Sequence, residues 1–188
     1  LERACHGAAK PRVDGPHRPR PFSPAQLARS LAGSAAFVSG CARLFASWAG
    51  DFQKHPNRLP RFDPEKALRA GGDPNIAYYH SYWKLAPDEA LVIEATPPKC
   101  DYWNFQLANH WLESLDYRYY RIHLNPFTAQ LRGDGSVRVV VAHSDPGVEN
   151  WLDTCGHAQG TMCWRWVGAV DPPEPRTRVV RLAELRLE

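Results

Sequence analysis

The chain has 188 residues, 44% of them hydrophobic, which suits one domain with a single hydrophobic core. Its formal net charge of +3 arises from basic residues crowded before residue 21, so the remainder is close to neutral. A nucleic-acid-binding fold carries its basic residues on the fold itself, so this distribution argues against a nucleic-acid partner. The crowded residues are Arg3, Lys10, Arg12, Arg18 and Arg20.

The cysteine pattern argues against a structural metal site. There are five cysteines, irregularly spaced, and no Cys-x-x-Cys pair or His-x-His pair accompanies them. We therefore expect no metal, although the fold could bring scattered histidines together, and reduced thiols in a cytoplasmic protein. The chain has no nicotinamide- or flavin-binding motif, so no cofactor is expected. No apolar segment of the signal-peptide kind opens the chain. Because the first residue is Leu1 rather than methionine, a fragment of a longer protein is expected.

Residues 1–22 form a proline- and arginine-rich segment. This composition lacks the apolar residues that would stabilise an ordered structure, so the segment is predicted to be a flexible, disordered arm. Two interpretations of the arm remain open, a solvated tail and a contact with an acidic partner.

A long amphipathic helix is expected next, in a region spanning residues 23–56. Ser23 and Pro24 supply an N-cap and a first helical residue, and the helix should run from about residue 24 to 54, ending before Pro56. Arg29 and Arg43 interrupt its apolar run, which argues against a membrane span. Its apolar face could dock on the following domain, on a missing N-terminal domain, or on a second subunit of a homo-oligomer. The residues at helical spacing are Leu27, Leu31, Ala35, Val38, Ala42, Phe45, Trp48 and Phe52.

A proline-punctuated linker over residues 57–74 leads to a β-domain over residues 75–188. Short strand-like segments separated by turns predict a mainly β fold, an antiparallel sandwich or barrel. The expected strands are 76–85, 90–96, 102–109, 117–124, 128–132, 136–143, 160–169 and 177–182.

Several motifs resemble those of one family. They are Tyr102-Trp103-Asn104-Phe105-Gln106-Leu107, Ser114-Leu115-Asp116-Tyr117-Arg118, Asp145-Pro146-Gly147, Asn150-Trp151-Leu152-Asp153-Thr154, Gly156-His157 and Arg165-Trp166. In this order they are similar to the family catalogued as domain of unknown function 1214, over roughly residues 73–182. The resemblance implies a jelly-roll-like β-sandwich, often at the C-terminal end of longer bacterial proteins, and it implies no particular activity. Cys155 departs from the pattern, where a small residue such as alanine is expected, which argues against a shared nucleophile there.

The predicted strands present polar faces where a simple core would be apolar. Alternation places Asn104 and Gln106 opposite Trp103, and amides are costly to bury unless they are paired. Such faces are typical of a ligand cavity, with rings as walls and a few polar groups to orient a small apolar or aromatic molecule. The alternative is that the tyrosines on these polar faces simply expose their hydroxyls at the sandwich surface. The other sets predicted to share a face are Tyr78, His80 and Tyr82; Tyr117, Tyr119, Arg121 and His123; and Thr161, Cys163 and Arg165.

The loop over residues 145–157 supplies the candidate catalytic groups. His157 is the expected acid or base, Asp153 its orienting partner, and Asn104 or Arg165 a donor to developing oxyanion charge. These groups suit hydrolysis or isomerisation. In the alternative interpretation Asp153 caps a turn and His157 packs on Trp151.

The expected ligand contacts come from the strand at 102–109, the segment at 117–119 and the loop at 150–157. We expect this loop to fold over the polar face of the strand and close one end of a cavity. A second hypothesis is a non-catalytic module that binds a lipid-like ligand or docks on a partner through its N-terminal helix. The expected ligand-contacting residues are Trp103, Gln106, Tyr117, Tyr119, Asn150 and Trp151.

Overall fold

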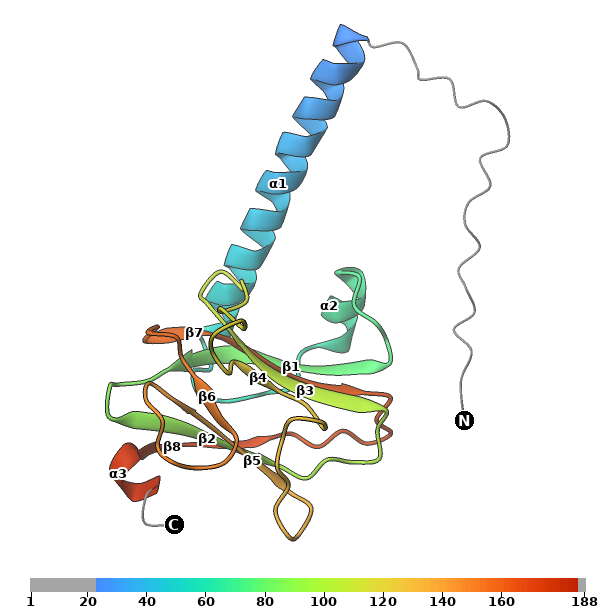
Figure 1. The fold of residues 1–188 in the computed structure, drawn as a ribbon. Coiled ribbons are helices and arrows are strands. Elements are labelled where there is room, and N and C mark those ends of the chain that lie inside the picture. Colours follow the sequence, from blue (N-terminus) through green and yellow to red (C-terminus); the bar gives the residue numbers. More distant parts are fainter. Residues whose placement is uncertain (1–22, 186–188) are drawn as a thin grey trace. The chain divides into compact units, whose positions relative to one another are not determined.

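The computed structural model describes residues 23–185, and the predicted arm at residues 1–22 lies outside the described residues. The chain divides into two units, one extending to Gly40 and the other beginning at Cys41. The second unit contains two four-stranded sheets stacked face to face (Figure 1). A mainly β sandwich preceded by a long helix is therefore confirmed.

The long helix α1 spans Pro24–Phe52, close to the predicted bounds. The Ser23 hydroxyl accepts the Gln26 N–H at 3.4 Å, which is the N-cap contact that the sequence predicts. The predicted linker holds a second helix, α2 (Pro64–Arg69). Asp63 caps α2 by accepting the N–H groups of Glu65 and Lys66. A short helix α3 (Leu182–Leu185) ends the described chain.

The first sheet has the order β1-β7-β3-β4, and all its strand pairs are antiparallel. Its strands are β1 (Ile76–Lys84), β7 (Gln159–Val167), β3 (Tyr102–Ala108) and β4 (His123–Leu124). The second sheet has the order β6-β5-β2-β8. Its strands are β6 (Trp151–Asp153), β5 (Val137–Ala142), β2 (Glu89–Ala95) and β8 (Arg176–Arg181).

One strand pair departs from the predicted antiparallel sandwich. β6 pairs in parallel with β5, in a segment for which the sequence predicted a loop. Three residues are too few to show the alternation that marks a strand, so only pairing with β5 reveals β6.

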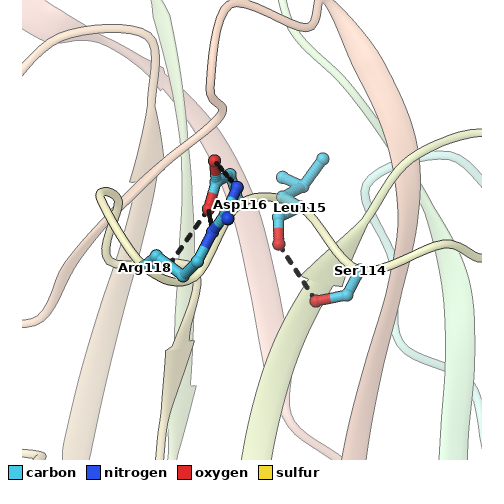
Figure 2. A network of polar contacts seen from close by, with 4 residues as sticks. All are labelled: Ser114, Leu115, Asp116 and Arg118. Carbon is cyan, nitrogen blue, oxygen red and sulfur yellow. Dashed lines mark hydrogen bonds and ion pairs between the residues drawn. The ribbon is translucent and has the colours of Figure 1, made fainter.

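The predicted strand at 117–124 was wrong over most of its length. Asp116 accepts the Arg118 N–H at 3.2 Å and pairs with the Arg118 guanidinium at 2.9 Å, as Figure 2 shows. Its carbonyl also accepts the N–H of Tyr120, so residues 116–120 form a turn. This local side-chain bonding competes with strand pairing, and only β4 remains extended. Likewise the predicted strand at 128–132 is reduced to one bridge, between Leu131 and Val137.

The core lies between the two sheets and is built on tryptophan. Trp164 stacks on Trp103 with ring centroids 5.2 Å apart, and Trp166 lies 5.2 Å from Trp164. From the second sheet, Leu91, Ile93 and Val139 complete the same cluster. A second cluster covers the outer face of that sheet, where Val92 and Val140 pack with Leu185. Among residues 23–185, no helix is long and apolar enough to cross a membrane.

Substitution of Gly160 by alanine tests how tightly the first sheet packs. A Cβ at this position would overlap the Ala108 carbonyl oxygen and lie 2.9 Å from the Trp83 ring, both of them buried. We expect Gly160→Ala to lower the free energy of unfolding by about 2 kcal/mol, the scale of core overpacking. Urea denaturation measures this. Gly133→Ala is the matched control, because nothing lies within 4 Å of a Cβ there. Equal stability of the two variants would contradict the packing described.

Candidate functional site

The outer face of the first sheet gathers polar side chains from three adjacent strands. Arg165 on β7 lies between Tyr78 on β1 and Asn104 on β3. Its guanidinium donates to the Asn104 side-chain oxygen at 3.3 Å. In the neighbouring row, Cys163 lies between His80 and Gln106. Three predicted site residues, Asn104, Gln106 and Arg165, are therefore brought together, and their alternation with a buried apolar face is as predicted.

Aromatic rings enclose His80 on this face. Phe52, in the last turn of α1, stacks on the imidazole with centroids 5.2 Å apart and planes 4° apart. Tyr78 stacks at 5.8 Å, and Phe62 meets the imidazole edge-on at 5.4 Å. The imidazole thus lies in an aromatic cage made by one strand, the end of α1 and the segment before α2.

The two ring nitrogens of His80 have different surroundings. Nε2 lies 3.6 Å from the Cys163 sulfur. Nδ1 is shielded from solvent and has no hydrogen-bond partner among residues 23–185. Burial, assisted by the positive charge of Arg165, lowers the pKa of His80 from 6.5 to about 3. His80 is therefore neutral at physiological pH and has one nitrogen unused.

Two cavities border the cage. One of about 210 Å³ is lined by Trp48, Phe62, Tyr78 and His80 together with one end of α2. The other, of about 340 Å³, also includes Trp48, Phe62 and His80. Trp48, Phe62 and His80 therefore contribute to the walls of both cavities.

Neither thiol near the predicted site is activated. Burial raises the pKa of the Cys163 thiol to about 12, despite the neighbouring Arg165. Burial, with the negative charges of Asp153 and Asp116, raises the pKa of Cys155 to about 11. Both stay protonated at neutral pH, and a thiol is a poor nucleophile in that form.

The Asn150–Trp151 pair lies on the second sheet, away from Asn104. The Asn150 side chain is buried, donates to the carbonyls of Gln130 and Arg138, and accepts the Gln130 N–H. Trp151 packs on the outer face of that sheet and donates to the Ala142 carbonyl at 3.2 Å. The expected closure of this loop over the strand at 102–109 was wrong, because β6 pairs with β5.

The expected catalytic pair lies in the turn that follows β6. The Asp153 carboxylate accepts the Cys155 N–H at 2.7 Å, and Cys155 adopts a φ of 53°. His157 is exposed, and its backbone N–H bonds to the Thr154 carbonyl. A turn capped by Asp153 is the alternative that the sequence left open, and a catalytic role for His157 stays a prediction.

The remaining predicted ligand residues are dispersed. Trp103 is enclosed in the core against Trp164, whereas Tyr117 and Tyr119 are exposed on the turn after Asp116. Their binding roles stay predictions. Within the described part of the chain, no group of three or more His, Cys, Asp or Glu side chains is arranged to hold a metal ion.

Sequence reasoning placed His80 on the correct strand face but did not select it as a site residue. Its signal was the run of Tyr78, His80 and Tyr82 at alternate positions. Nothing local indicated Phe52 and Phe62, because they reach the imidazole from segments outside the sheet.

Neither a family model nor a curated protein matches the chain. Among solved structures, it is similar to an uncharacterized protein from Burkholderia cenocepacia, with 52% identity and a TM-score of 0.88. That match covers 92% of this chain and 48% of the other. A protein from Vibrio parahaemolyticus shares the fold at 17% identity and a TM-score of 0.50, over 86% of this chain and 47% of that one. The chain thus spans about half the length of both structures.

The burial of neutral His80 predicts acid sensitivity. In the folded protein its pKa is about 3, whereas the unfolded chain takes up this proton near pH 6.5. Stability should therefore fall as the pH drops below 6.5 towards 3, by up to roughly 1.4 kcal/mol per pH unit for this one proton. Between pH 7 and pH 5, the free energy of unfolding measured by urea denaturation should fall less in His80→Gln than in the wild type. His123→Gln, at an exposed position, should keep the wild-type loss. Equal losses in all three proteins would show that His80 is not buried in its neutral form.

Proposed function

We propose that this chain binds a small, largely apolar, planar molecule with an anionic group, on the outer face of the first sheet. The observation that carries the proposal is the unused Nδ1 of His80, held between aromatic rings next to Arg165. A buried nitrogen without a partner costs roughly 1–3 kcal/mol, so folds seldom retain one without a use.

The hydrogen-bond roles of His80 suit a ligand with a polar edge. Cys163 has one proton and lies 3.6 Å from the Trp164 carbonyl, to which it can donate. In that arrangement Nε2–H donates to the sulfur, and Nδ1 offers a lone pair. With the opposite tautomer, Nδ1 offers an N–H. In both cases a polar ligand group near Nδ1 completes the bonding of the imidazole.

Arg165 accounts for the anionic group. Within residues 23–185, no carboxylate forms an ion pair with its guanidinium, which bonds only to the neutral Asn104 amide. Arginine recognises carboxylates through paired N–H donors. Tyr78 lies directly across from Arg165 and lines the 210 Å³ cavity, so an aromatic body over Tyr78 brings its carboxylate towards Arg165.

Binding fits these groups better than acid/base catalysis. A histidine with a pKa of about 3 is a weak base, and Cys163 with a pKa of about 12 is a weak nucleophile. Hydrolysis or isomerisation through His157 and Asp153 is a separate hypothesis, and its residues lie in the turn after β6.

We also propose that the chain is related to the domain of unknown function 1214 family. The proposal rests on the order of the motifs between Tyr102 and Trp166.

Calorimetric titration with naphthalene-2-carboxylate tests the proposed site, with the neutral naphthalene-2-carboxamide as the matched ligand. We expect saturable binding of the carboxylate that weakens at least tenfold in Arg165→Gln, while the carboxamide changes less than twofold, because only the carboxylate pairs with the guanidinium. Arg176→Gln, at an exposed position of β8, and His157→Ala should bind like the wild type.

Two results would overturn the site. One is carboxylate binding that does not saturate. The other is equal weakening by Arg165→Gln and Arg176→Gln, which would indicate a general response to positive charge. Loss of binding in His157→Ala would instead move the site to the turn after β6.

A further inference from the structure

One stripe of α1 has the spacing of a helix–helix seam. Apolar or small residues recur at alternating intervals of four and three, which is the heptad pattern of helices that pack side by side. Arg29 and Arg43 both fall on the opposite side of the helix. The stripe consists of Leu27, Leu31, Ser34, Val38, Cys41, Phe45, Trp48 and Phe52.

Most of this stripe is exposed. Leu31 is 62% exposed and Val38 is 65% exposed, and on the flank of the stripe Phe37 reaches 72%. Large apolar side chains gathered on one helix face mark a surface that packs on another element. Helices in folded proteins also gain most of their stability from such packing rather than from propensity.

The stripe is continuous in sequence with a packed contact. Its last two members, Trp48 and Phe52, contact Phe62 with ring centroids 6.0 and 6.1 Å apart, and Phe52 is buried on His80. The seam therefore begins where α1 meets the first sheet, and its spacing repeats unchanged back to Leu27.

We propose that this stripe packs against a helix of a second domain, one equivalent to the half of the Burkholderia cenocepacia structure that this chain does not match. The match leaves out 8% of 188 residues, about 15, so at least about 14 of the 29 residues of α1 belong to the shared part. The same structure has a further half-length of chain available as a partner. The 3.5-residue spacing makes a helix the fitting element on the partner's side.

The experiment uses a chimera, the full Burkholderia protein with its matched segment replaced by this chain. Hydrogen exchange read by mass spectrometry compares the backbone amides of residues 25–45 in the chimera and in the chain alone. We expect at least tenfold slower exchange of these amides in the chimera. Leu31→Glu with Val38→Glu should abolish the slowing. Ala36→Glu with Ser47→Glu adds the same charge on the far face and should preserve it.

Three outcomes would overturn the proposal. The first is equal exchange in the chimera and in the chain alone, with β3 and β7 protected in both, which shows that the domain does not cover the stripe. The second is protection in the chain alone that rises with its concentration, which assigns the stripe to a second copy. The third is equal loss of protection in both double variants. Fast exchange of the β3 and β7 amides in the chimera would mean that the chimera has not folded. This chain and the unmatched half of the Burkholderia protein are then co-expressed as separate chains. If the two do not co-purify as a one-to-one complex, the proposal is wrong.

Discussion

The contact between Phe52 and His80 joins the end of α1 to the outer face of the first sheet, and both proposals depend on it. The two rings lie almost parallel at 5.2 Å, so the helix end removes the imidazole from water. This removal keeps His80 neutral and leaves Nδ1 enclosed. The same phenylalanine ends the heptad stripe, so the site and the proposed seam share one residue.

The inner face of the first sheet stabilises the fold, and the outer face carries the polar groups of the proposed binding site. Inward residues such as Trp103 and Trp164 fill the space between the sheets and supply most of the hydrophobic stabilisation. The outward residues Asn104, Arg165 and His80 contribute less apolar area and leave polar groups incompletely paired. A sheet can carry such a face because the opposite face holds the fold together.

The segment between β5 and β7 stabilises the sandwich through hydrogen bonds within the chain. Asn150 occupies a left-handed backbone position with a φ of 56°, and its side-chain amide bonds to Gln130 just before the start of β6. His143 contacts the Thr154 hydroxyl at 2.8 Å and the Leu85 carbonyl at 3.2 Å. A dense run of polar residues can therefore hold a connecting segment in place by hydrogen bonds. For this reason such density alone does not locate a functional site.

The sequence alone determined the helix, most strands and the face of the side chains within those strands, because periodicity and capping act over a few residues. Ser23 with Pro24 gave the start of α1, and alternation in β3 separated Trp103 from Asn104. Tertiary structure decided which faces meet. The pairing of β6 with β5 moved Trp151 to the second sheet, and Phe52 and Phe62 came to His80 from outside its sheet. Contacts of this kind depend on the packing of segments far apart in sequence, and local residue patterns carry no record of them.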